Sequence, residues 1–205
     1  MRIAIVGSGK VGRALGNAWK AAGHGVTYAM REAAGDKAKA LAAEGFGVAG
    51  PSEAAREAEV VLLAVPWGEI PAVIDALGPL DGRVLVDATN PLTPDRDLAL
   101  GFDDSAGETV GLLAQGARVV KAFNTTGADN MQKARDFPVK PAMFVAGDDA
   151  DAKKIVQTLA EEIGFEAIDA GPLKASRYLE PMAMQWIKLA YAGAGTQFAF
   201  ALTRR

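Results

Sequence analysis

The chain has 205 residues, of which 50% are hydrophobic and 23% are charged, and its formal net charge at pH 7 is -3. This length suits one domain with a sizeable core and is too short for a nucleotide-binding domain followed by a full substrate domain. The weakly acidic balance does not favour nucleic acid or an anionic membrane as a partner. Cysteine is absent and His24 is the single histidine, which excludes disulfides, thiolate nucleophiles and zinc-thiolate sites. We therefore predict no metal site.

The N-terminal residues lack the pattern of a secretory signal, and no apolar stretch approaches the roughly 18 residues of a membrane span. We therefore expect a cytoplasmic protein without a membrane segment.

Short β-branched runs alternate along the chain with Ala- and Leu-rich stretches of helical spacing. In chain order the predicted elements are a strand at 2–6, a helix at 10–22, a strand at 25–30, a helix at 33–44, a strand at 59–65, a helix at 68–77, strands at 82–88, 117–123 and 141–148, a helix at 151–164 and a strand at 165–171. The strands are continuously apolar, which is typical of a parallel sheet covered by helices on both faces. The sequence thus predicts one doubly wound, Rossmann-like α/β domain over 1–205, with a mostly parallel sheet and a C-terminal helical segment at about 176–205.

The stretch from 90 to 108, NPLTPDRDLALGFDDSAGE, interrupts this alternation with Pro, Asp and Gly and shows no periodicity. It predicts a long loop that leaves the end of a strand. Loops of this length inside a compact domain are usually functional or disordered.

The first strand is followed by a glycine-rich turn of the form G-x-G-x-x-G, which opens the first helix. Gly7 permits the tight turn, Gly9 lets a pyrophosphate approach the backbone, and Gly12 lets the helix pack close to the strand. Free N–H groups at the helix start then face the phosphates. The predicted dinucleotide contacts here are Gly7, Ser8, Gly9, Lys10, Val11 and Gly12.

The end of the second strand distinguishes NAD from NADP. NAD-binding proteins place an Asp or Glu there to hold the ribose 2′-hydroxyl. This chain has Met30 followed by Arg31, whose guanidinium suits a 2′-phosphate, and Lys37 stands in the next helix. The sequence favours NADP, with Met30, Arg31 and Lys37 as contacts.

Three later strand ends point at the same edge of the sheet. Trp67 offers a flat ring near the expected ribose and nicotinamide, or serves as ordinary packing. Asn90 and Asn124 suit the orientation of a carboxamide or a second ligand, although Asn also caps turns for local reasons. The candidate ligand contacts are Ala64, Val65, Pro66, Trp67, Asn90, Pro91, Leu92, Ala122, Phe123 and Asn124.

Taken together, these stretches resemble the deazaflavin-dependent NADP oxidoreductases and the cytoplasmic reductase domain of the six-transmembrane metalloreductases. The resemblance covers almost the whole chain. Its motifs are the glycine turn at 7–12, MRE at 30–32, VPW at 65–67, VVKAFNT at 119–125, FVAGDD at 144–149 and DAGPLKASRYLEP at 169–181.

The resemblance implies an NADP-dependent oxidoreductase that transfers hydride to or from a second redox ring, either a deazaflavin (coenzyme F-420) or a flavin such as FMN or FAD. The ring would lie near residues 90–92 and 122–124, and GPL at 171–173 would close its pocket. Two departures stand out. Met30 replaces a serine that often contacts the 2′-phosphate, and KAFNT at 121–125 is closer to the flavin-using metalloreductases, which leaves the acceptor open.

No side chain stands out as a catalytic acid or base, and we assign no catalytic residue. His24 precedes the second strand, at the edge of the sheet opposite the expected crevice. Lys121, near a strand end, suits either proton donation to a product or an ion pair with an acid. Arg177 and Glu180, spaced i, i+3, predict a mutual ion pair on one helix, and Asp87 predicts a buried hydrogen-bonding group.

Three hypotheses follow. The first is NADP(H)-dependent hydride transfer with a deazaflavin or flavin. The second is a small-molecule imine or keto-acid reductase, which the short chain after the last strand disfavours, and the third is a non-catalytic NADP(H) sensor. Apolar and aromatic residues in the tail, Trp186, Tyr191, Phe198 and Phe200, suit either a homodimer surface or the last part of the core.

Overall fold

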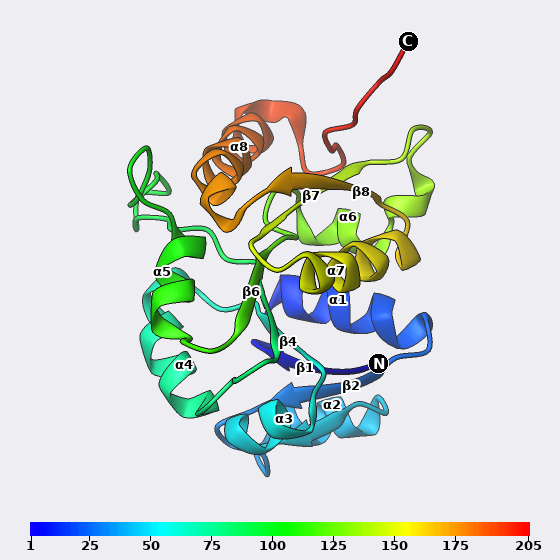
Figure 1. Cartoon of the computed structure of the whole chain (residues 1–205). Coiled ribbons are helices and arrows are strands. Elements are labelled where there is room, and N and C mark those ends of the chain that lie inside the picture. Colours follow the sequence, from blue (N-terminus) through cyan, green and yellow to red (C-terminus); the bar gives the residue numbers. More distant parts are fainter.

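The computed structural model describes residues 1–205 and contains one eight-stranded sheet of spatial order β3-β2-β1-β4-β5-β6-β7-β8 (Figure 1). The strands are β1 (Arg2–Val6), β2 (Gly25–Ala29), β3 (Gly47–Ala49), β4 (Val60–Leu63), β5 (Val84–Asp87), β6 (Arg118–Lys121), β7 (Ala142–Gly147) and β8 (Glu166–Gly171). All neighbouring pairs are parallel except β6 and β7. The predicted Rossmann-like, mostly parallel α/β fold is confirmed.

Helices connect the strands at bounds close to those predicted. They are α1 (Lys10–Ala21), α2 (Asp36–Ala43), α3 (Pro51–Glu57), α4 (Ile70–Leu77), α5 (Ala106–Leu113), α6 (Ala128–Gln132), α7 (Ala150–Glu162) and α8 (Ser176–Leu189), with short turns η1 (Trp67–Glu69), η2 (Ala134–Asp136), η3 (Leu173–Ala175) and η4 (Ala190–Ala194). The sequence interpretation missed β3, α3, α5 and α6, all of which are short. The loop predicted at 90–108 spans 88–105 in the structure, since β5 ends at Asp87 and α5 begins at Ala106.

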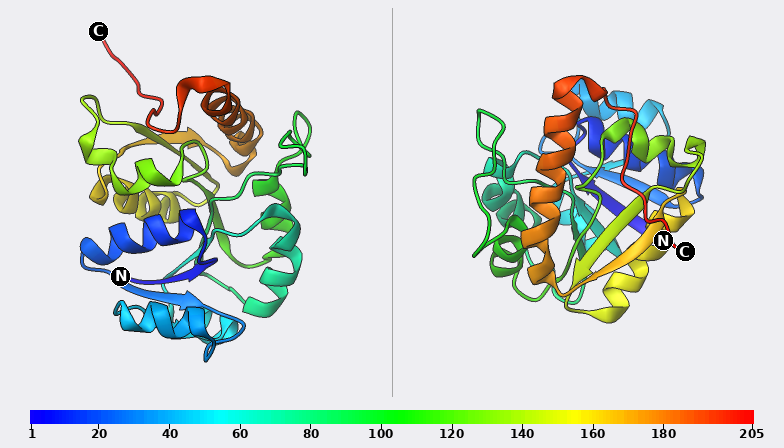
Figure 2. Two further views of the ribbon diagram at one scale, coloured as in Figure 1. Left: turned by 180° about the vertical axis from the view of Figure 1, so that it is seen from behind. Right: turned by 90° about the horizontal axis from the view of Figure 1, so that it is seen from above.

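Helices cover both faces of the sheet, which explains why the strands are apolar throughout (Figures 1 and 2). In β1, Ile3 and Ile5 belong to the core that faces α1, α6 and α7, whereas Ala4 and Val6 belong to the core that faces α3, α4 and α5. Helix α8 packs on the β7–β8 end of the sheet through Leu179.

The strand register aligns the last residues of five strands. Val6 of β1 pairs with Ala29 of β2 and Leu63 of β4, Leu63 pairs with Asp87 of β5, and Asp87 pairs with Lys121 of β6. Because these strands are parallel, the segments that follow this row all emerge at one edge of the sheet. The candidate ligand contacts after β1, β2, β4, β5 and β6 therefore share that edge.

The C-terminal segment is helical only through η4, and residues 195–205 have no regular secondary structure, so the helical segment predicted at about 176–205 is too long. The ring of Phe198 stacks on Trp186 with centroids 5.1 Å apart. The Phe200 carbonyl accepts a 2.8 Å hydrogen bond from the Ala142 N–H at the start of β7. Trp186 and Phe198 therefore pack within the chain, whereas Tyr191 is 70% exposed.

Candidate functional site

The glycine turn lies between β1 and the start of α1, and its three glycines serve different purposes. Gly7 has a φ of +109°, and a Cβ there would collide with the Ala64 carbonyl. A Cβ on Gly12 would collide with the Gly7 carbonyl. These two glycines are required by the fold itself.

Gly9 differs from both because, apart from the adjoining residues, no atom lies within 4 Å of the position its Cβ would take. Its backbone is extended, with φ -74° and ψ -170°, which any residue adopts. It is the N-cap of α1, where no side chain caps the first N–H groups and no acidic residue stands in the first turn. Nothing in the fold requires glycine here, so the open space in front of α1 is available to a ligand.

Tyr28 of β2 holds α1 in place behind this turn. Its hydroxyl donates a 3.0 Å hydrogen bond to the Gly12 carbonyl. A Cβ on Gly16, one turn further along α1, would collide with the same hydroxyl. Burial raises the pKa of Tyr28 to about 12, so the phenol stays protonated and remains a donor. The start of α1 is thereby fixed relative to β1 and β2.

A groove of about 560 Å³ runs from the glycine turn to the end of β2. Its lining residues are Val6, Gly7, Ser8, Ala29, Met30, Arg31, Glu32, Lys37, Pro51, Val65, Glu69, Ala72, Val73 and Ala76. The structure thus brings together the predicted Gly7, Ser8, Met30, Arg31, Lys37 and Val65.

Charge in this groove is balanced. The Arg31 side chain is 85% exposed, and its guanidinium lies 4.0 Å from the Glu69 carboxylate. Glu32 and Lys37 are also exposed. Met30, which follows β2 directly, packs against the core. The end of β2 therefore has an apolar residue where a carboxylate would hold a ribose 2′-hydroxyl. Sequence reasoning missed Glu69, whose place in the groove depends on η1.

The segment after β4 divides in two. Val65 lines the groove, whereas Trp67 is partly buried against the core on the α4 face and does not line it. Trp67 thus packs against the core, and its contact with a ribose or nicotinamide stays a prediction. Pro66 is exposed between them.

Asn90 and Asn124 meet across the ends of β5 and β6. The Asn90 Nδ2 donates to the Asn124 backbone carbonyl at 3.0 Å, and the Asn124 Nδ2 donates to Asn90 Oδ1 at 3.1 Å. The Asn124 Nδ2 also donates to the Leu179 carbonyl of α8 at 3.2 Å. These bonds join β5, β6 and α8 at the edge of the sheet.

The expectation that the Phe123 ring shapes a ligand pocket is wrong. Phe123 has a φ of +60° and is 1% exposed, and its ring packs edge-on against Trp19 of α1 at 5.5 Å. Ala122 is fully buried. The side chains of both residues lie in the core, so only their backbone groups remain available at the sheet edge.

Lys121 is fully buried and occupied by three acceptors. Its ammonium donates to Asp87 Oδ2 at 2.9 Å and to the Thr89 carbonyl at 2.7 Å, and it lies 2.8 Å from Glu180 Oε1. Burial alone would lower the pKa of Lys121, but the charges of Asp87 and Glu180 raise it above its ordinary value. An ammonium has three N–H donors, so none is left for a ligand. The ion-pair alternative for Lys121 is therefore confirmed.

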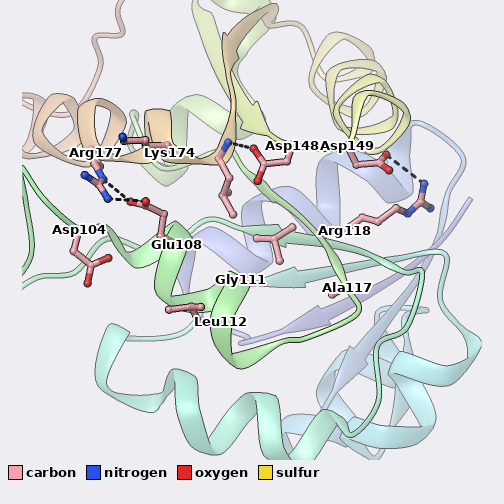
Figure 3. A pocket seen from close by; sticks show the side chains of 12 residues that line it. Asp104, Glu108, Gly111, Leu112, Ala117, Arg118, Asp148, Asp149, Lys174 and Arg177 are labelled. Atoms are coloured by element: carbon pink, nitrogen blue, oxygen red, sulfur yellow. Dashed lines mark hydrogen bonds and ion pairs between the residues drawn. The ribbon is translucent and has the colours of Figure 1, made fainter.

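The predicted ion pair between Arg177 and Glu180 does not form. Arg177 makes two hydrogen bonds to the Glu108 carboxylate, at 2.7 and 2.8 Å (Figure 3). Glu180 instead contacts Lys121 and accepts from the backbone N–H groups of Ala106 and Gly107 at 2.9 and 3.1 Å. Partners on α5 and β6 replace the neighbour on the same helix.

The resemblance implies that GPL at 171–173 closes the pocket of a second ring near residues 90–92 and 122–124. In the structure Leu173 lines a cavity of about 740 Å³. Arg118, at the start of β6, lines the same cavity (Figure 3). The Leu173 N–H donates to Asp148, which follows β7. The register sets Gly171, the last residue of β8, level with Ala146 of β7 and Lys121 of β6. Because β7 and β8 run antiparallel to β6, the chain after Gly171 continues toward the amino-terminal end of β6.

His24 lies before β2, away from the groove, as expected. Its Nε2 is 2.7 Å from Glu162 and its Nδ1 is 3.1 Å from the terminal amine. Asp87 is the expected buried hydrogen-bonding group, because it also accepts from the Thr89 N–H and hydroxyl at 2.8 and 2.7 Å.

No group of three or more His, Asp or Glu side chains is arranged to hold a metal ion. None of the helices combines the length and hydrophobicity needed to cross a membrane.

The sheet order and the glycine turn define a Rossmann-like α/β protein. A family model described as NADP oxidoreductase, coenzyme F420-dependent, matches residues 2–91. The chain is 33% identical to the F420-dependent NADP reductase of Methanocaldococcus jannaschii over 153 residues, which are 70% of this chain and 68% of that protein. It is similar over its full length to a crystal structure of a candidate F420-dependent NADP reductase from Arthrobacter sp. FB24, with a TM-score of 0.91, 32% identity and 100% of both chains covered. The chain belongs to the coenzyme F420-dependent NADP oxidoreductase family.

Two further proteins are similar to this chain in a more restricted way, one over a part of its own length and one in fold alone. The metalloreductase STEAP3 of Rattus norvegicus is 28% identical over 185 residues, which are 90% of this chain but 36% of that protein. An imine reductase from Aspergillus terreus superposes with a TM-score of 0.68 at 18% identity, over 93% of this chain and 61% of that one. That likeness shows the shared fold alone.

Proposed function

We propose that this protein transfers hydride between NADP(H) and a deazaflavin or flavin. Gly9 is the observation that carries the proposal. No contact within the chain requires a glycine at this position, and Gly9 precedes uncapped N–H groups at the start of α1. Such N–H groups bind phosphate through hydrogen bonds and the helix dipole. A pyrophosphate accounts for both features.

Cations at the end of β2 support NADP rather than NAD. Arg31 and Lys37 line the same groove as the glycine turn, and β2 ends without the carboxylate that would hold a ribose 2′-hydroxyl. Glu69, at 4.0 Å from Arg31, is far enough for the guanidinium to pair with a phosphate instead. The proposed NADP contacts are Gly7, Ser8, Gly9, Lys10, Val11, Gly12, Met30, Arg31, Lys37 and Val65.

A redox ring as acceptor is supported by the family and by the chemistry of the sheet edge. Reduction of a carbonyl or imine usually needs a positioned proton donor, whereas transfer between two rings needs mainly alignment. The protons of Lys121 are all engaged, and His24 lies elsewhere. Asn90 is only half-buried at the sheet edge, and its amide is suited to orient a ring rather than to donate a proton.

Anaerobic mixing of the protein with NADPH and one acceptor at a time tests this function. Deazaflavin coenzyme, FMN and FAD are compared with a panel of cyclic imines and 2-keto acids, and loss of the oxidised ring absorbance is followed with NADPH oxidation. We expect reduction of at least one tricyclic ring and no turnover of the panel. Turnover of an imine or keto acid without reduction of any ring would contradict the proposal and favour the small-molecule reductase. No turnover of any acceptor would favour the NADP(H) sensor.

The homodimer also stays a proposal. In the C-terminal segment Leu189 and Tyr191 are exposed, while Trp186 and Phe198 pack within the chain. Light scattering of the unmodified protein and of Tyr191→Ser measures whether this segment joins two copies.

A further inference from the structure

The Lys121 cluster holds both ends of the long loop that follows β5. Lys121 donates to the Thr89 carbonyl, where the loop begins. Glu180, which pairs with the same ammonium, accepts from the N–H groups of Ala106 and Gly107, where the loop ends. One buried network therefore fixes the entry and the exit of the 90–105 segment.

The Thr89 carbonyl belongs to the same planar peptide unit as the Asn90 N–H, so fixing one orients the other. Asp87 adds a second restraint, because it accepts from the Thr89 N–H and hydroxyl while it pairs with Lys121. Asn90 in turn donates to the Asn124 backbone. The position of the Asn90 carboxamide thus depends on an ammonium that has no access to a ligand.

We propose that Lys121 is a positioning residue, which sets the Asn90–Asn124 pair and the 90–105 loop for hydride transfer through its hold on Thr89 and Glu180. The proposal rests on the proposed function for its effect on rate. Its structural part, the fixing of the loop ends, is independent of any acceptor. A misplacement of about 1 Å in an aligned site can cost on the order of a hundredfold in rate.

Lys121→Met alone would leave two buried carboxylates without a counter-charge, and such a variant is expected to unfold readily. The informative variant is the neutral triple Asp87→Asn/Lys121→Met/Glu180→Gln, which removes every formal charge of the cluster together. The matched control is Lys153→Met/Asp169→Asn, which neutralises an ion pair of 2.8 Å between α7 and β8. The other hydrogen bonds of this pair are with Gly171 of β8, and none is with the 88–105 loop.

Three measurements apply to both variants: thermal unfolding, the dissociation constant of NADPH, and the single-turnover rate with the tricyclic acceptor that the unmodified protein reduces. We expect the triple variant to fold and to bind NADPH within about threefold of the unmodified protein, and to transfer hydride about 10- to 100-fold more slowly. The control should keep its rate. A folded triple variant with an unchanged rate would contradict the positioning role and show that the cluster contributes to packing alone.

Amide hydrogen exchange of the unmodified protein tests the fixed loop ends without an acceptor and without any variant. The amides of residues 88, 89, 106 and 107, each of which has an acceptor, should be protected as strongly as those of β5, while 93–104 exchange at least tenfold faster. In the folded triple variant the protection of the two ends should fall by at least tenfold. Loop ends that exchange as fast as the loop centre in the unmodified protein would overturn the proposal, whatever the acceptor proves to be.

Discussion

Replacement of Gly9 by valine separates nucleotide binding from folding. A Cβ at this position meets no atom beyond the adjoining residues within 4 Å, and the backbone conformation is an ordinary one, so we expect the native packing to be kept. The expected cost to the free energy of unfolding is that of a poorer N-cap, about 1 kcal/mol. For a chain of this size, that lowers the midpoint of thermal unfolding by about 2–4 °C.

The effect on NADPH should be much larger than the effect on stability. A branched side chain in front of α1 removes the approach of a pyrophosphate to the backbone. Hydrogen bonds to charged groups are worth about 1.5–3 kcal/mol each, so the loss of one or two weakens binding by about 100-fold. Calorimetric titration with NADPH measures this, and far-UV circular dichroism checks the fold.

Two further glycine variants make the result interpretable. Gly50→Val replaces another glycine N-cap with no neighbour within 4 Å, and it measures the cost to stability alone. Gly12→Ala places a Cβ against the Gly7 carbonyl and should disrupt the fold itself. A folded Gly9→Val protein that binds NADPH with unchanged affinity would refute the reasoning and place the dinucleotide elsewhere.

Other predictions concern individual contacts. NADPH should be preferred over NADH by at least tenfold in catalytic efficiency, about 1.4 kcal/mol, and Arg31→Ala should remove most of this preference while sparing NADH; equal use of both nucleotides by the unmodified protein would contradict the assignment. Hydrogen bonds from Arg177 hold the pKa of Glu108 below its ordinary 4.5. Their contribution is therefore present at pH 7 and lost as the pH falls below 4.5, so the thermal midpoints of the unmodified protein and Glu108→Gln should converge in acid. Tyr28→Phe should cost about 1 kcal/mol in urea unfolding, because the Gly12 carbonyl loses its donor; an unchanged midpoint would show that the hydroxyl does not hold α1.

Local signals explain the features that the sequence predicted well. The glycine turn, the basic end of β2 and the continuous strands each depend on residues that are close together in the chain. Parallel strands then place their ends at one edge, which is why Gly7, Arg31 and Val65 share a groove.

The features that the sequence did not predict depend on the directions of side chains and strands, and on partners that are distant in the chain. A φ of +60° at Phe123 turns its ring into the core, and no sequence pattern at this position signals that conformation. Spacing on one helix suggested an Arg177–Glu180 pair, but α5 and β6 supply nearer partners for each side chain. The connection after β6 permits either strand direction, and the antiparallel β7 moves Leu173 away from the carboxyl ends.

The cluster of Asp87, Lys121 and Glu180 also limits how this chain can change over evolutionary time. Loss of Lys121 leaves two buried carboxylates without a counter-charge, since each side chain is at most 1% exposed. Loss of Asp87 or Glu180 leaves a buried Lys121 N–H, and the backbone N–H groups that the carboxylate serves, without an acceptor. Single replacements are therefore expected to be eliminated by their effect on stability before any gain elsewhere can be selected. A lineage can leave this arrangement only through compensated changes, so the three positions should covary among relatives even though they are far apart in the sequence.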